Sequence, residues 1–280
     1  MSDSLPKVTH PNVRDSRPRW RPTALVQASA AVHVAAAGSV LLAPGLWPWA
    51  VGGVVADHLL LTAAGLWPRS TLLGPNWVRL PDAAVQRRQV ALTIDDGPDP
   101  QITPPVLDLL DQYQVRATFF CIGARVAAYP DLAREIVRRG HAVENHSQQH
   151  LHRFSLLGPR AMAAEVAAAQ DTIGAITGHA PRFFRAPAGL RNPFLDPVLS
   201  RLSLRLASWT RRGFDTVAQS PATVVRRLLR GLAAGDILLL HDGHAARTAA
   251  GAPVIIEALP PVLSALRDAA LEPITLAMAL

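Results

Sequence analysis

The sequence predicts an α/β protein: a barrel of parallel strands with helices between them, preceded by a helical hairpin that crosses a membrane. Three observations support this prediction. Short β-rich runs alternate with amphipathic stretches from Val90 onward, as in repeated strand and helix units around a mostly parallel sheet. Several of these runs end in polar residues, and barrel enzymes carry their catalytic residues at the carboxyl ends of several strands. Two apolar segments precede the first run.

Residues 24–43 and 46–66 are expected to be the two spanning helices. Each approaches the ~20 residues that a membrane helix needs. The stretch "APGLWPW" between them predicts a tight turn at an aromatic interface. The first segment has the basic lead-in of a secretory signal, but a second apolar segment follows at once and no clean cleavage site stands out. A hairpin is therefore the favoured interpretation.

Basic residues set the expected orientation of the hairpin. They flank it within residues 14–21 and 69–88, while the connecting loop has none, so the positive-inside rule places both ends in the cytoplasm. An aspartate at mid-bilayer costs about 2.5 to 3.5 kcal/mol. Asp57 and His58 are therefore expected either to pair with His33 on the first helix or to lie in the interface.

Composition narrows the class of protein. A hydrophobic content of 49% in 280 residues suffices for a sizeable core. The net charge of +7 suggests nucleic acid, but the arginines are spread along the chain and only 5% of residues are aromatic, so we expect no nucleic-acid partner. A position beside the membrane explains part of the charge. The single cysteine, Cys121, excludes an intramolecular disulfide and is expected in the core.

The alternating pattern defines the expected elements and boundaries. Strands are predicted at residues 90–95, 117–121, 141–145, 182–185, 204–208, 236–240 and 272–275. Helices are predicted at residues 103–113, 130–139, 159–176, 221–233 and 254–269. The expected divisions are a basic cytoplasmic tail at 1–23, the hairpin at 24–67, a proline-containing linker at 68–88 and the globular domain at 89–280.

Seven strands with helices between them fit either a barrel or an open doubly wound sheet. Neither a dinucleotide glycine fingerprint nor a P-loop follows the first strand. Polar residues gather instead at several strand ends, which favours the barrel. These residues are Asp95, Asp96, Asn145, His146, Arg185, His241 and Asp242.

The stretch "HSQQH" contributes a candidate metal site. His146 and His150 are four residues apart, so on one helical turn both imidazoles would project from the same face. Two histidines and one carboxylate form a facial site for a divalent metal with open positions. The spacing alone is weak evidence, because most such pairs are solvated helix surface. The Asp95–Asp96 pair upstream strengthens it.

Five motifs together resemble those of a known family. "TIDDGP" (93–98), "HSQQH" (146–150), "RAPAG" (185–189), "WTRRGFDT" (209–216) and "LLLHD" (238–242) are similar, in order and spacing, to the motifs of the NodB-like polysaccharide deacetylases, carbohydrate esterase family 4. The resemblance covers roughly residues 88–278. It implies a deformed (β/α)7 TIM-like barrel, here in a membrane-anchored member. It also implies a metal-dependent N-deacetylase that usually uses zinc, with cobalt, nickel or iron as alternatives.

The resemblance also implies roles for individual residues. Asp95 would be the general base that takes a proton from the attacking water, and Asp96 would ligate the metal with His146 and His150. His241 would be the general acid that protonates the leaving amine, a role that suits the ordinary pKa of histidine.

Further positions would support and shape the site. Arg185 matches the arginine that orients the base, and Asp215 matches the carboxylate that holds the acid histidine. The substrate pocket is expected to contain Trp209, Leu239, Pro187 and Gly189. The chain departs from the family pattern at Ala188, at Thr216 and at Arg212, which occupies an acidic position. We therefore expect retained chemistry and altered substrate choice. His10, His152, His179 and His244 are expected to have no role.

The expected function is hydrolysis of an N-acyl group, N-acetyl above all, from an amino sugar of a cell-envelope glycan or a lipid-linked sugar precursor. A catalytic domain on the cytoplasmic side of the bacterial inner membrane favours the lipid-linked precursor. The alternatives are a periplasm-facing deacetylase of peptidoglycan or exopolysaccharide, a non-catalytic glycan-binding relative, and a non-haem iron oxygenase. Asp95 and His241 favour hydrolysis over the oxygenase, because only amide hydrolysis requires an acid/base pair beside the metal.

Overall fold

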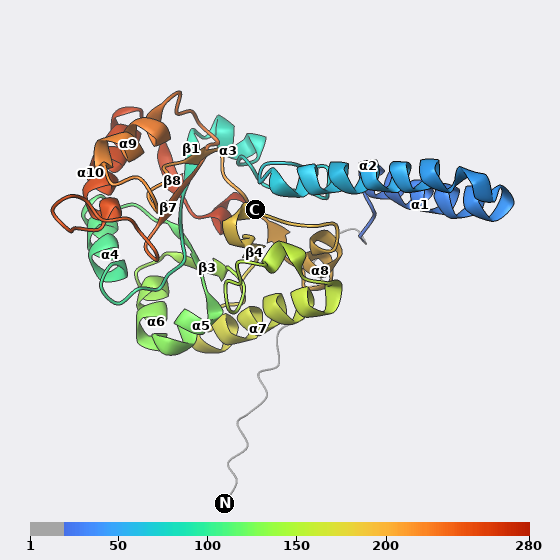
Figure 1. Cartoon of the computed structure of the whole chain (residues 1–280). Helices are drawn as coiled ribbons and strands as arrows, with labels where there is room; N and C mark the ends of the chain where they lie inside the picture. Colours follow the sequence, from blue (N-terminus) through green and yellow to red (C-terminus); the bar gives the residue numbers. More distant parts are fainter. Residues whose placement is uncertain (1–19) are drawn as a thin grey trace, which may run out of the picture.

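The computed structural model describes residues 20–280 (Figure 1). Most of the expected tail, including His10, lies outside the described residues. The strands are β1 (Gln89–Asp95), β2 (Thr118–Cys121), β3 (Ala142–Asn145), β4 (Phe183–Phe184), β5 (Arg205–Leu206), β6 (Arg211–Arg212), β7 (Ile237–His241) and β8 (Glu272–Ile274). All seven predicted strands are present within a residue or two at each end. The short strand β6 was not predicted.

All the strand pairs are parallel, and the sheet curls into a barrel wall. The order is β5-β4-β3-β2-β1-β7-β6, and β8 pairs with the first residues of β1. The central pairs are in register, with Asp95 opposite Phe120 on β2 and opposite His241 on β7. Because parallel strands end at the same edge, this register gathers the strand ends of β1, β2, β3 and β7 at one rim.

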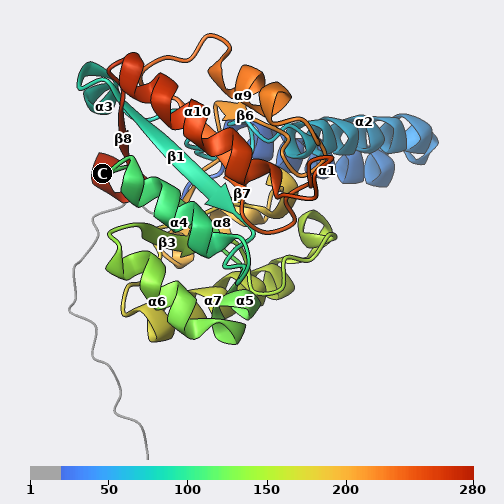
Figure 2. The same cartoon turned by 90° about the vertical axis from the view of Figure 1, so that its left-hand side faces the viewer.

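Helices cover the outside of this wall. They are α3 (Asp82–Gln86), α4 (Thr103–Gln112), α5 (Gly123–Ala128), α6 (Pro130–Arg138), α7 (Pro159–Thr177), α8 (Leu195–Arg201), α9 (Pro221–Leu229) and α10 (Val254–Asp268). Figure 2 shows α4 and α10 along the outer face beside β1. The five predicted helices are confirmed. The short helices α3, α5 and α8 were not predicted, because five to seven residues carry too little periodicity to stand out.

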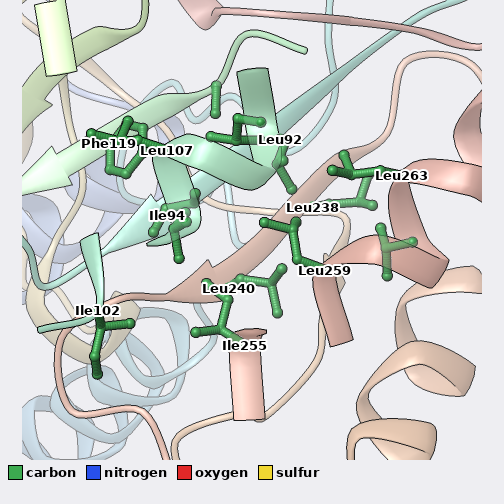
Figure 3. Packing of buried hydrophobic residues seen from close by; sticks show 14 of the residues in the cluster. Leu92, Ile94, Ile102, Leu107, Phe119, Leu238, Leu240, Ile255, Leu259 and Leu263 are labelled. Atoms are coloured by element: carbon green, nitrogen blue, oxygen red, sulfur yellow. The ribbon is translucent and has the colours of Figure 1, made fainter. Parts of the chain in front are cut away.

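Alternate side chains of β1 face two different cores. Leu92 and Ile94 pack outward, in the cluster that also contains Leu238 and Leu240 of β7 and residues of α10 (Figure 3). Ala91 faces inward, toward a cluster with Phe120, Phe183 and Leu239. Since successive strand residues point to opposite faces, Thr93 and Asp95 share the inward face with Ala91. The side chain of Asp95, the candidate general base, therefore points into the barrel.

The segment 68–88, expected as a linker, is part of the barrel wall. Trp77 bridges to Ala207 and Arg79 to Asp236, so the segment crosses the gap between the end strands β5 and β6. The Arg79 guanidinium lies 2.6 Å from the buried Asp236 carboxylate. These contacts add backbone pairing beside the end strands β5 and β6, which are only two residues long. Isolated bridges of this kind leave no periodic pattern in the sequence, so they were not predicted.

Helices α1 (Ala24–Leu42) and α2 (Trp47–Leu66) lie side by side and project away from the barrel (Figure 1). Both are long and apolar enough to cross a membrane. Their polar residues pair with one another: the Ser29 hydroxyl donates to Asp57 at 2.7 Å, and the Nε2 atoms of His33 and His58 lie 3.1 Å apart. The expected pairing of Asp57 and His58 with His33 is confirmed.

Candidate active site

The strand ends of the barrel surround one cavity of about 710 Å³. Its lining includes the predicted residues Asp95, Asp96, His146, His150, Gly189, Trp209, Leu239 and His241, together with Ala124, Arg125, His152, Ala186, Ala188, Arg212, Thr216 and His244. Pro187 is buried and is not among the lining residues. Residues from six separate segments thus meet at one rim of the sheet.

Asp96, His146 and His150 bring three ligand atoms together. The Nε2 atoms of both histidines lie 3.2 Å from Asp96 Oδ1. That oxygen is buried and has no hydrogen-bond partner among the described residues. Nδ1 of His146 donates to the Arg185 carbonyl at 2.8 Å, which leaves the Nε2 lone pair facing the carboxylate. An orphaned carboxylate oxygen that faces imidazole lone pairs fits a divalent cation between them, so the donor set suits a metal.

The two histidines converge without a helix. The prediction that "HSQQH" forms a helical turn is wrong: residues 146–150 form a loop in which Ser147 and His150 have positive φ values of 64° and 50°. Asn145 holds this loop by accepting the Ser147 N–H at 2.9 Å, and the Ser147 hydroxyl accepts the His150 N–H at 3.0 Å. These side-chain bonds replace the helical pattern, as asparagine and serine commonly do in turns.

The side chains of Asp95 and Asp96 point in different directions because strand β1 ends at Asp95. Asp95 continues the inward face of β1, whereas Asp96 has a φ of 75° and its carboxylate turns toward the histidines. The next residue, Gly97, leaves no room for a side chain, because a Cβ there would lie 2.4 Å from the Asp242 carboxylate. The adjacent carboxylates therefore reach two different sets of partners.

Arg185 fixes one oxygen of Asp95. Its guanidinium donates to Asp95 Oδ1 at 2.6 Å, to Thr93 Oγ1 at 2.8 Å and to the carbonyls of Ala207 and Ser208. The group is 1% exposed and stacks on the Phe120 ring at 4.1 Å. Burial lowers the pKa of Arg185, and the Asp95 charge opposes that effect. The second oxygen, Asp95 Oδ2, lies on the side of the candidate metal ligands, 3.9 Å from His146 Nε2.

Asp215 holds His241 on the neighbouring strand. One carboxylate oxygen accepts His241 Nδ1–H at 2.9 Å, and the other accepts the His241 backbone N–H at 2.7 Å. Burial alone lowers the pKa of His241, but the hydrogen bond and charge of Asp215 outweigh it, so this pKa is raised. The bond at Nδ1 directs the Nε2–H of the protonated ring away from Asp215, and the ring lines the cavity.

Opposing influences act on the pKa values of the candidate ligands. Burial raises the pKa of Asp96, but the neighbouring imidazoles of His146 and His244 outweigh it and hold the carboxyl well below its usual range. Burial is the largest influence on His150 and lowers its pKa to about 4. An ionised carboxylate beside a neutral imidazole is the protonation state in which these groups bind a metal.

His244 is a site residue that sequence reasoning missed. Its Nδ1 lies 3.2 Å from Asp96 Oδ2, and its Nε2 lies 3.4 Å from Arg125 of α5. The only sequence signal was its position two residues after Asp242, in the loop that follows β7. This loop begins at a strand end of the rim, so its residues reach the cavity.

Three comparisons place the chain among known proteins. A family model described as polysaccharide deacetylase matches residues 82–207. The chain is 38% identical over 158 residues to a chitooligosaccharide deacetylase of Bradyrhizobium sp. (strain ANU 289), covering 56% of this chain and 72% of that protein. It is 34% identical over 156 residues to a peptidoglycan-N-acetylglucosamine deacetylase of Bacillus cereus, covering 55% and 72%.

Solved structures show the same barrel. Peptidoglycan deacetylase PdaC from Bacillus subtilis matches with a TM-score of 0.61 and 29% identity, over 68% of this chain and 89% of that one. A family 4 carbohydrate esterase from Streptomyces lividans matches with a TM-score of 0.60 and 32% identity, over 66% and 91%. The predicted deformed (β/α)7 barrel is confirmed by this likeness.

Proposed function

The chain belongs to the polysaccharide deacetylase family, and from this premise we propose that it removes the N-acetyl group from an amino sugar of a cell-envelope glycan or of its lipid-linked precursor. The observation that carries the proposal is that a candidate metal site and a candidate acid/base pair lie side by side at the rim. The unpartnered Asp96 oxygen faces His146 and His150, and an acid/base pair stands beside it on register-paired residues of β1 and β7.

Asp96, His146 and His150 would hold the metal. A divalent cation in this position supplies Lewis-acid chemistry, which polarises an amide carbonyl and acidifies a water molecule. We propose zinc, because two imidazoles and one carboxylate form a common catalytic zinc site with a position left open. The Arg185 carbonyl keeps the proton of His146 on Nδ1 and so presents Nε2 as a ligand.

Asp95 and His241 would move the protons. Asp95 is the general base: Arg185 anchors its Oδ1, so Oδ2 is free to take a proton from the attacking water. His241 is the general acid: Asp215 keeps its pKa raised, so the ring still carries a proton for the leaving amine near neutral pH. Leu239 and Trp209 line the cavity and offer an apolar surface for the acetyl methyl group.

Three residues that line the cavity differ from the family pattern. Arg212 stacks on Trp209 at 5.3 Å and on Phe214 at 4.8 Å, and it lines the cavity with Ala188 and Thr216. An arginine in an acidic position favours a substrate that carries negative charge near the amino sugar. This supports a phosphate-bearing precursor as the substrate. The basic residues that flank the hairpin support a catalytic domain on the cytoplasmic side of the inner membrane.

Acetate release tests the proposed activity. The purified full-length chain in detergent, stripped with a chelator and reloaded with zinc, should release acetate from a water-soluble N-acetylchitooligosaccharide, and omission of the metal should remove the activity. Asp96→Asn serves as the inactive control. Failure of the zinc-loaded wild type on this substrate, on peptidoglycan and on a lipid-linked N-acetylglucosamine would refute the proposal.

A membrane-topology experiment distinguishes the cytoplasmic catalytic domain proposed above from the alternative of an exported one. Reporters fused after Leu280, alkaline phosphatase in one version and a fluorescent protein in another, report the side of the membrane on which the catalytic domain lies. Fluorescence without phosphatase activity supports the cytoplasmic precursor. The opposite result favours peptidoglycan or exopolysaccharide as the substrate and leaves the roles of the site residues unchanged.

A further inference from the structure

A second cavity lies where the hairpin meets the barrel. It has a volume of about 400 Å³ and opens between α2 and the loops that follow β3 and β4. Its lining is Val26, Ser29, His58, Leu61, Thr62, Gly65, Leu66, Ser155, Leu156, Arg191, Asn192, Pro193 and Phe194. We call this cavity the hairpin groove. Apolar side chains dominate it, and the lining contains one arginine and no carboxylate.

Close contacts hold the groove in a fixed place. The Arg191 N–H donates to the Gly65 carbonyl at 3.1 Å, and a Cβ on Gly65 would lie 2.1 Å from the Arg191 oxygen, so α2 and the loop after β4 are in direct backbone contact. Thr23, at the start of α1, donates to the Leu72 carbonyl at 2.7 Å. The base of the hairpin is therefore docked on the barrel.

The groove is a neighbour of the catalytic cavity. Gly189 lines the catalytic cavity and Arg191 lines the groove, and two residues span at most about 7 Å. The loop after β3 behaves in the same way: His152 lines the catalytic cavity, while Ser155 lines the groove. The two cavities therefore lie on neighbouring stretches of the same two loops.

One N–H of the buried Arg191 guanidinium lacks a hydrogen-bond partner among the described residues. Arg191 is 4% exposed, and the N–H in question is that of its Nε. One terminal nitrogen donates to the Ser70 carbonyl. Burial lowers the pKa of Arg191 to about 10, against the charge of Asp196, so the group is still cationic at neutral pH. A buried N–H of a charged group is costly when unpaired, and phosphate is one of the anions to which a guanidinium donates strong, often bidentate, hydrogen bonds.

We propose that the hairpin groove binds the polyprenyl phosphate carrier of an N-acylated amino sugar, with the phosphate at Arg191, the first isoprene units along α2, and the sugar in the catalytic cavity. The proposal rests on the proposed function and specifies its substrate. The lipid is the occupant that the surroundings favour, because the groove continues onto helices that are long and apolar enough to cross a membrane. Exposed Leu156 and Phe194 extend the apolar surface at its edge.

Three substitutions, Arg191→Gln, Arg191→Lys and Thr62→Trp, and two matched controls test the groove. Arg191→Gln removes the charge, and Thr62→Trp fills the groove from α2 without altering Arg191. Ala63→Trp places the same bulk on the adjacent exposed position outside the groove, and Arg153→Gln removes an exposed arginine of the loop after β3. Each zinc-loaded full-length protein is assayed in detergent on N-acetylglucosamine joined through phosphate to a polyprenol, and on a water-soluble N-acetylchitooligosaccharide.

The proposal predicts substrate-dependent losses. Arg191→Gln should lower kcat/KM for the lipid-linked substrate about tenfold or more, the effect of losing a hydrogen bond to a charged group. Thr62→Trp should act in the same direction, Arg191→Lys should recover part of the loss, and all variants should stay within about twofold of wild type on the soluble substrate. Both controls should match wild type on both substrates.

Other outcomes overturn the inference and can be told apart. Equal losses on both substrates would show that Arg191 and Thr62 act only through the structure, and no loss on either would show that the groove is not used. If excess phosphatidylglycerol abolished the preference of wild type for the lipid-linked substrate, the groove would hold an ordinary phospholipid. An absence of acetate from both substrates would overturn this inference, and a further absence of acetate from peptidoglycan would refute the proposed function as well.

Discussion

Two regions of this molecule contain the same trio of residue types, and the two trios differ in how their polar atoms are paired. The barrel rim holds Asp96 with His146 and His150, and the hairpin holds Asp57 with His33 and His58. At the rim, both imidazoles face one carboxylate oxygen that has no hydrogen-bond partner among the described residues. In the hairpin, the groups satisfy one another.

Hydrogen bonds link the residues of the hairpin trio and Ser29. Asp57 accepts the Ser29 hydroxyl, His33 Nδ1 donates to the Ser29 carbonyl at 2.8 Å, and His33 Nε2 meets His58 Nε2. A network of this kind lowers the cost of placing polar groups in a membrane and ties two helices together. The difference teaches that the marker of a ligand site is an unsatisfied buried atom, whereas residue composition alone does not distinguish the two regions.

The largest expected effect is the loss of metal from the rim. Asp96→Asn removes one ligand charge and should lower zinc affinity by more than about 100-fold, beyond the range that residues outside the ligand set reach. Asp57→Asn makes the same change in the hairpin and should leave zinc content unaltered. Elemental analysis of both purified variants checks this, and zinc loss from Asp57→Asn would show that the hairpin trio also binds metal.

The next largest effect is expected for a substitution that lowers activity without changing metal binding at the rim. Asp95→Asn should lower kcat/KM by about 10² to 10⁴, the usual contribution of a general base, while zinc content stays at the wild-type level. Acetate release and elemental analysis on the same preparation provide the measurement. Full activity in this variant would remove Asp95 from the role of base.

A smaller effect concerns the acid side of the rim. His241 must be protonated to donate, so activity falls as pH rises through its pKa, and Asp215 raises that pKa. Asp215→Asn should therefore move the alkaline limb of the kcat/KM profile to lower pH. A profile with an unchanged alkaline limb and a uniform loss of activity would indicate that Asp215 only supports the structure around His241.

The smallest effect belongs to the hairpin network. Ser29→Ala removes the hydroxyl that donates to Asp57 and should cost about 0.6 kcal/mol of stability, the average for side-chain hydrogen bonds between membrane helices. Acetate release should be unchanged. A double-mutant cycle of Ser29→Ala and Asp57→Asn measures the coupling in detergent, and a value of zero would mean that this bond contributes nothing to helix association.

Sequence reasoning located the rim well because the strand periodicity is strong there. The all-buried run of β1 and the polar residues that end it are visible in the residue order, and the parallel register then brings Asp95 and His241 together. The hairpin was visible for a similar reason, since two long apolar segments are a local signal.

The errors arose where contacts distant in sequence decide the conformation. The loop at residues 146–150 is held in place by Gly123 of α5, whose N–H donates to the Ser147 carbonyl at 3.0 Å, and by Ala124, whose N–H donates to the Gln148 carbonyl at 2.9 Å. The periodicity argument for a helix could not include these bonds. His244 and Arg191 were missed in the same way, because their partners Asp96 and Gly65 lie far away in the chain.

A zinc titration followed by acetate release tests the central claim most directly. The metal-free full-length chain is titrated with zinc, and bound metal and activity are measured in the same samples. The account predicts that activity rises in proportion to bound zinc and reaches its plateau at one metal ion per chain. Activity that is independent of zinc, or zinc that binds without restoring acetate release, would contradict it.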